Sequence, residues 1–184
     1  MRTGFRLRQT KTGSRNFTKV FATVRKATFR ESIIQHLRQE LERQTSAAEL
    51  ARDEATSEES RAENKWDTHS QEAAYLAEGQ AKLAAEISAS IELIGTMPLP
   101  DFGPEEPIAI GALVELQSMK TQRRSLYFLG PRAGGLELVV DSRSVLVLTP
   151  QSPLGRQLLG RHVGDTVPAP GGPSAGSLRV VAVA

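Results

Sequence analysis

The residues best suited to chemistry gather in one short stretch, EESRAENKWDT at positions 58–68. This acidic stretch holds Glu58, Glu59, Glu63, Asp67 and Trp66, the only tryptophan of the chain. The chain has no cysteine, which excludes disulfides and thiolate metal sites, and its three histidines show no spacing typical of metal ligands. Any chemistry here therefore rests on carboxylates. The alternative is a solvated bend in which Trp66 only packs against aliphatic side chains.

Length and composition limit the possible classes of protein. The 184 residues suffice for one to two domains. Hydrophobic residues make up 39% of the chain but aromatic residues only 5%, so the core must be mainly aliphatic. No apolar run approaches the length of about 18 residues that a membrane span requires. Together with the absence of cysteine, this predicts a soluble, cytoplasmic protein with no membrane partner.

The charges are divided unevenly along the chain. The net charge is only +2, yet residues 1–30 hold nine basic residues and no acidic one. Residues 31–106 hold six basic and seventeen acidic residues, whereas residues 107–184 hold eight basic and four acidic residues. This asymmetry predicts a basic module for docking and an acidic module with a different purpose.

Residues 1–26 form a basic arm without an acidic residue or a continuous apolar segment, so they do not resemble a secretory signal. An organelle transit peptide has a superficially similar composition, and lysines and arginines of this kind can also bind phosphates without sequence preference. We expect a disordered extension and assign it no function.

Two stretches with a heptad period predict an antiparallel coiled-coil hairpin over residues 27–96, standing largely alone. Apolar or small residues alternate at spacings of three and four in both, and neither contains proline. The first seam is Ile34, Leu37, Leu41, Gln44, Ala48, Ala51 and Ala55, and the second is Ala73, Leu76, Gln80, Leu83, Ile87, Ser90 and Ile94. Each helix would span roughly 45 Å at ~1.5 Å per residue. The acidic stretch is then at the far end, and Gln44 and Gln80 are expected to set the register.

A proline-rich linker over residues 97–107 precedes a segment with the period of strands. Strands are predicted at 108–116, 125–130, 136–140, 144–148 and 178–184, and one short helix within SPLGRQLLGRHVGDTV at 152–167. Ser152 is the expected N-cap, Pro153 the first helical residue and Gly160 the helix stop. Residues 108–184 therefore form a small, mostly antiparallel β domain, and the fold class is α+β.

The same helical segment resembles the signature of the C-terminal domain of the GreA/GreB transcript cleavage factors. In that family a Ser-Pro helix, an ALxGK-like segment and a GDxV turn precede the last strand. Those factors also carry an antiparallel coiled coil with an acidic tip, so the resemblance covers about residues 27–184. It implies an FKBP-like C-terminal domain. The residues that match and are expected to determine the fold are Ser152, Pro153, Leu154, Gly155, Leu158, Leu159, Gly160, Gly164 and Asp165.

The resemblance implies an accessory factor of bacterial RNA polymerase rather than an enzyme. The family hairpin enters the secondary channel, where tip carboxylates help hold a second Mg²⁺ so that the polymerase cleaves its own backtracked transcript. The expected partner is the polymerase core, bound by a monomer that meets nucleic acid only through the elongation complex. Mg²⁺ would be shared with the polymerase rather than bound permanently. Arg156 and Arg161 either solvate the short helix or contact the polymerase rim.

The acidic stretch matches the family tip only in part. The tip of the family reads like GDLxENAEY, and Glu63-Asn64 matches its Glu-Asn, whereas Ser60 stands where the family has Asp. Glu63 is therefore the first candidate for the metal-holding carboxylate. Glu59 is the candidate for the second. The auxiliary tip residues are Asn64, Trp66 and Asp67.

Three other functions fit parts of the sequence. Ser60 favours a related channel ligand that blocks or modulates the polymerase without promoting cleavage. A prolyl isomerase or holdase would fit an FKBP-like fold, but residues 107–184 contain only Tyr127 and Phe128 as aromatic residues, and fold alone does not determine function. A purely structural coiled-coil adaptor would leave the acidic stretch unexplained.

Overall fold

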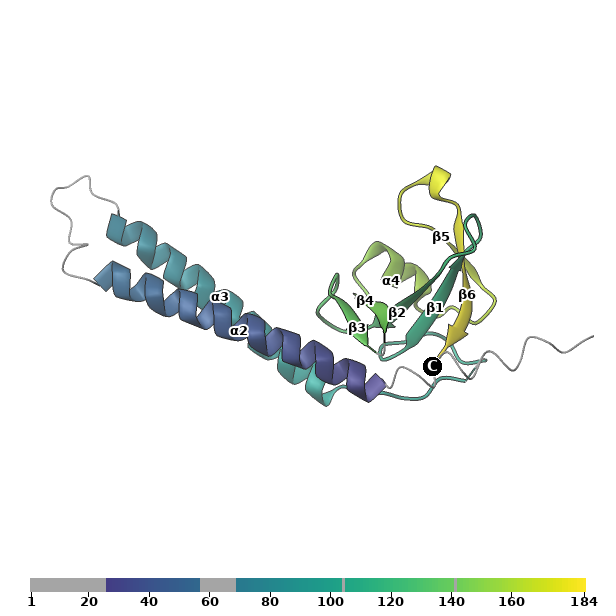
Figure 1. Ribbon diagram of the computed structural model, residues 1–184, viewed down its shortest axis with the longest axis horizontal. Helices are drawn as coiled ribbons and strands as arrows, with labels where there is room; N and C mark the ends of the chain where they lie inside the picture. Colours follow the sequence, from purple (N-terminus) through teal and green to yellow (C-terminus); the bar gives the residue numbers. More distant parts are fainter. Residues whose placement is uncertain (1–25, 57–68, 104, 141) are drawn as a thin grey trace, which may run out of the picture.

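The computed structural model describes residues 26–56, 69–103, 105–140 and 142–184. Its first two elements are long helices, α2 (Lys26–Thr56) and α3 (His69–Thr96), which pack antiparallel as a rod (Figure 1). Both are rich in alanine, glutamate and glutamine and contain no proline, so helix propensity is high throughout. The predicted helical hairpin is confirmed. No helix among the described residues has the length and apolar character to cross a membrane.

The two helices do not use their predicted seams equally well. Helix α2 packs along the predicted positions, with Ile34 and Ala51 buried. In α3 the predicted Leu76 and Leu83 are 54% and 41% exposed. The other five predicted positions are buried or half-buried: Ala73, Gln80, Ile87, Ser90 and Ile94. Between them the helix also turns Ala77, Ala84 and Ile91 inward, so that the best-buried set is Ala73, Ala77, Gln80, Ala84, Ile87, Ile91 and Ile94. This set has the same alternating spacing of three and four, so the period could not distinguish the two sets. Alanine rather than leucine lies between the helices, because its small side chain lets them approach closely.

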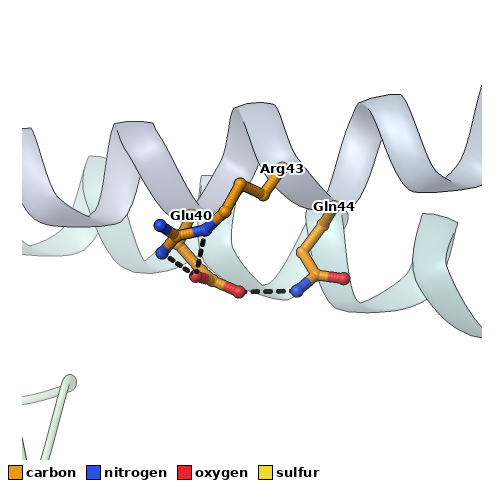
Figure 2. Close-up of polar contacts among 3 residues, drawn as sticks. All are labelled: Glu40, Arg43 and Gln44. Carbon is orange, nitrogen blue, oxygen red and sulfur yellow. Dashed lines mark hydrogen bonds and ion pairs between the residues drawn. The ribbon is translucent and has the colours of Figure 1, made fainter.

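Gln44 makes its contacts within its own helix rather than across the seam. Its Nε2 donates a hydrogen bond to Glu40 Oε1 at 2.5 Å, and Arg43 Nε donates to Glu40 Oε2 at 3.0 Å (Figure 2). These hydrogen bonds, that from Gln44 first, lower the pKa of the Glu40 carboxyl below its usual range. Gln80 Oε1 is buried without a hydrogen-bond partner among the described residues. No described hydrogen bond of either glutamine therefore fixes the register expected of them.

The C-terminal half forms a six-stranded sheet in the order β3-β4-β2-β1-β6-β5. Only β2 and β4 pair in parallel, so the sheet is mixed rather than wholly antiparallel. The cause is the tight β3–β4 hairpin, which folds back so that β4 lies between β3 and β2. The α+β class is confirmed. The strands are β1 (Leu113–Ser118), β2 (Arg124–Leu129), β3 (Glu137–Val140), β4 (Arg143–Leu148), β5 (Thr166–Pro168) and β6 (Ser177–Val183), with helix α4 (Pro153–Leu158) and the 3-10 turn η2 (Pro173–Ala175).

Both faces of the sheet are buried, each in a separate core. One core joins the sheet to the base of the hairpin, and its members include Phe29, Ile33, Ile94, Leu113, Phe128, Val145 and Val147. The other lies under the short helix, and its members include Val114, Leu116, Leu154, Leu158 and Val180. Burial on both faces explains why the strands read as nearly continuous apolar runs. The hairpin therefore does not stand alone, because its base is part of the core of the β domain.

The first turns of α2 also bind the segment that follows α3. Lys26 Nζ donates a hydrogen bond to the carbonyl oxygen of Pro100 and lies 3.8 Å from Asp101 Oδ1. One turn later, Arg30 Nη1 donates to the carbonyl oxygen of Met97 at 3.3 Å. Burial lowers the pKa of Lys26, although Asp101 acts in the opposite direction. The start of the hairpin and its exit are thus tied together beside the sheet.

Candidate functional site

The acidic stretch is attached to the end of the hairpin that is farthest from the sheet. The last turn of α2 and the first turn of α3, the helix ends on either side of it, lie there (Figure 1). Helix α2 has 31 residues, which at ~1.5 Å per residue corresponds to about 46 Å. The roles predicted within the stretch stay predictions, because all of its candidate residues lie outside the described residues: Glu59, Glu63, Asn64, Trp66 and Asp67.

The described part of the distal hairpin carries an open groove of about 680 Å³ between the two helices. Five of its lining residues are alanines, and Glu49, Arg52 and Glu78 are the charged ones. Nearby Leu50 and Tyr75 are 71% and 74% exposed. Neither residue was predicted to be functional, although an aromatic residue outside both seams is a signal that the sequence contains. No three His, Asp or Glu side chains of the described residues are arranged to hold a metal ion.

The Ser-Pro motif positions α4 through hydrogen bonds and a steric requirement. Ser152 Oγ accepts a hydrogen bond from the Gly155 amide at 3.1 Å and donates one to the Thr149 carbonyl oxygen at 2.8 Å. Pro153 is the first helical residue, so the predicted N-cap is confirmed. A Cβ at Gly155 would lie 2.0 Å from the Thr149 carbonyl oxygen, which leaves room only for glycine. Leu154 is buried in the core beneath the helix.

The end of the motif turns the chain into the last strands. Gly160 and Gly164 have φ angles of 75° and 98°, a conformation that glycine adopts without steric cost. Asp165 Oδ2 accepts a hydrogen bond from the His162 amide at 3.0 Å and closes the turn. Leu158 is buried and Leu159 is 37% exposed. The fold-determining role of these residues stays a prediction.

Arg156 and Arg161, the predicted docking residues, are both exposed. Arg156 lies in α4, between the buried Gly155 and Leu158. Arg161 Nε donates a hydrogen bond to the Gln157 carbonyl oxygen at 3.4 Å. Neither arginine makes an ion pair with another described residue. Both guanidinium groups are accessible to solvent or to a partner.

The aromatic residues of the β domain do not form an open pocket together. Phe128 is 1% exposed, with its ring against Phe29 of the hairpin. Tyr127 is half-buried and faces the core under α4. An isomerase pocket lined by this pair therefore has no support in the geometry.

Comparisons with known proteins give similarities among solved structures only. No family model and no curated protein matches the chain. The chain is similar to GreA factor homolog 1 (Gfh1) of Thermus thermophilus, with 24% identity over 82% of this chain and 94% of that one and a TM-score of 0.34. Gfh1 of Thermus aquaticus gives 24% identity over 83% and 92%, with a TM-score of 0.34. The prokaryotic transcription elongation factor GreA/GreB from Nitrosomonas europaea gives 20% identity over 57% and 78%, with a TM-score of 0.32.

Proposed function

We propose that this chain is a transcription factor of the GreA/GreB family that binds bacterial RNA polymerase. The β domain docks on the core enzyme, and the hairpin enters the secondary channel with its acidic stretch foremost. There the protein stimulates cleavage of backtracked transcripts as an accessory factor, without a nuclease activity of its own. The observation that carries the proposal is the attachment of the acidic stretch to the far end of a rod of about 46 Å, whose base is fixed on a β domain with the Ser-Pro-Leu-Gly helix.

Glu63 and Glu59 are the residues assigned to the chemistry. Their carboxylate oxygens are hard ligands of the type that Mg²⁺ takes, and one or two protein carboxylates suffice because Mg²⁺ keeps several of its waters. A second metal ion at a polymerase site would stabilise the attacking and leaving oxygens of phosphoryl transfer. Glu63 and Glu59 would hold that ion and orient a water. Asn64, Trp66 and Asp67 would position the loop.

A second candidate function shares the docking but not the chemistry. Ser60 stands where the GreA/GreB tip has Asp, and serine lacks the charge that helps to hold a divalent cation. A protein with one fewer carboxylate can occupy the channel and modulate the polymerase without promoting cleavage. This alternative is a polymerase-channel regulator or antagonist.

A cleavage assay on stalled, backtracked elongation complexes separates the two candidates. The proposal expects transcript shortening from the 3′ end to accelerate when the full-length protein is added with Mg²⁺. An absence of acceleration, together with competition against a cleavage-competent GreA or GreB factor, would select the non-cleaving regulator. A failure to bind the polymerase core would reject both functions.

A further inference from the structure

A second site is formed by a hollow of about 420 Å³ over the first residues of β2 and β4. We call it the arginine hollow, because its lining includes Arg123, Arg124 and Arg143, together with Glu115 and Glu137. Strands β2 and β4 run parallel, so Arg124 and Arg143, their first residues, lie at the same end of the sheet. The volume falls within the roughly 300–1,000 Å³ typical of binding sites.

Glu115 is the only charged residue that is buried among the described residues, with 4% of its surface exposed. Its Oε2 accepts a hydrogen bond from Arg124 Nη1 at 3.4 Å. The Arg124 side chain is 53% exposed, so solvent weakens this ion pair, and the burial of Glu115 costs desolvation; the pair therefore adds little to stability. The register between β1 and β6 also shifts directly after Glu115, and such irregularities often re-aim side chains beside functional sites. Glu115 is therefore explained better as a support that orients Arg124 than as a contribution to folding.

The other two arginines of the hollow, Arg123 and Arg143, are not paired with either glutamate that lines it. The Glu137 carboxylate accepts a hydrogen bond from the Ser144 hydroxyl, and Glu115 contacts Arg124. Arg123 and Arg143 make no ion pair with any described residue. A guanidinium group presents a planar fork of donors that matches a carboxylate in a two-point contact. The hollow thus offers two guanidinium groups that have no ion-pair partner among the described residues, beside the Arg124 guanidinium that Glu115 orients.

We infer that the arginine hollow binds acidic side chains of a partner protein. The inference rests on the proposed function, which supplies the RNA polymerase core as that partner. Carboxylates are favoured over nucleic-acid phosphates because Glu115 and Glu137 line the same hollow and would repel a continuous phosphate backbone, whereas single carboxylates can meet Arg123 and Arg143 one at a time. The hollow is a docking contact additional to Arg156 and Arg161 on α4.

The test compares two double variants of the full-length protein for binding to the RNA polymerase core. Arg123→Gln with Arg143→Gln removes both free charges of the hollow. Arg132→Gln with Arg179→Gln removes the same charge from exposed positions of the same domain outside the hollow. The first variant is expected to bind at least tenfold more weakly at low salt, with a shallower dependence of Kd on salt, because ion pairs are lost. The control is expected to remain within twofold of the wild type.

Each other outcome has a defined meaning. Equal binding by both double variants and the wild type would overturn the inference and leave the proposed function intact. No binding by the wild type would reject the proposed function, and the inference with it. A loss of binding to a single-stranded RNA oligomer, with polymerase binding unchanged, would assign the hollow to phosphates and overturn the inference. Thermal unfolding of each variant, followed by circular dichroism, checks that the domain remains folded.

Discussion

Phe29 of α2 meets Phe128 of β2 edge to face, with ring centroids 5.2 Å apart and an interplanar angle of 66°. Both side chains are fully or almost fully buried. Edge-to-face aromatic pairs contribute about 0.5–1.5 kcal/mol beyond the burial of their area. This pair belongs to the core that joins the hairpin to the sheet, so we expect the stability of the two parts to be coupled through it.

Phe29→Ala should lower the free energy of unfolding by about 3–5 kcal/mol, because it removes a buried aromatic ring and leaves a cavity. In a denaturant titration monitored by circular dichroism and by near-ultraviolet absorption, the signals of the helices and of the sheet should both be lost at a lower denaturant concentration than in the wild type. Tyr75→Ala is the control, since Tyr75 is 74% exposed and its loss should change stability by no more than about 0.5 kcal/mol. An effect of Phe29→Ala confined to the helical signal would contradict the coupling.

The seam of α3 can be tested with a pair of aspartate substitutions. Ile87→Asp should separate the helices, because Ile87 is only 8% exposed and a charge there would be buried. Leu83→Asp should be much milder, because Leu83 is 41% exposed and its carboxylate can reach water. Thermal melts followed by the helical signal at 222 nm would measure both. Equal losses of thermal stability in the two variants would mean that Leu83 belongs to the buried seam, as predicted from the sequence.

Gly155→Ala should destabilise the β domain by several kcal/mol, or prevent it from folding. The added Cβ would overlap the Thr149 carbonyl oxygen, which lies 2.0 Å from its ideal position. Gly79→Ala is the matched control. Gly79 is an exposed position in α3 with nothing within 4 Å of an added Cβ, so alanine there should stabilise the helix by about 0.5–1 kcal/mol. Chemical denaturation of the two variants should therefore shift in opposite directions.

Glu63→Ala should abolish stimulated cleavage while polymerase affinity stays within a few-fold, because one carboxylate contributes much to a metal site and little to a large docking surface. A loss of ~1.4 kcal/mol in transition-state stabilisation already lowers the rate tenfold. Glu59→Ala should be nearly as damaging, whereas Ser60→Asp should raise the cleavage rate by restoring the acid of the family tip. Glu58→Ala serves as the control. Equal activity of wild type and Glu63→Ala in single-turnover cleavage would remove Glu63 from the site.

The sequence was sufficient for those elements that local rules determine. The heptad period predicted both long helices, and the Ser-Pro dipeptide predicted the N-cap and start of α4, because capping depends on neighbours in the chain. The choice between Leu83 and Ala84 as the buried residue was different. Either residue fits an alternating spacing of three and four. Only the distance to the partner helix decides which of the two is buried.

Contacts between distant segments were the part that could not be predicted. In the sequence, Phe29 is one more apolar residue at the start of a helix. Nothing local indicates its burial, because its partner Phe128 is 99 residues away. The parallel pairing of β2 and β4 likewise depends on where the β3–β4 hairpin folds back. The three-residue β5 is too short to carry a periodic signal. For the acidic stretch, the residue types and their spacing support a chemical hypothesis that the cleavage assay tests.

The base of the hairpin is attached to the rest of the protein through Lys26, Phe29 and Arg30, so any tilt of the rod takes place about these residues. Small rotations there are amplified along about 46 Å of helix. A tilt of about 5° at the base would displace the far end by about 4 Å over that length. This displacement exceeds the variation in length that a metal-ligand bond allows. Under the proposed function, residues at the base of the hairpin would thereby decide whether the carboxylates of the acidic stretch reach the polymerase active centre in the right position.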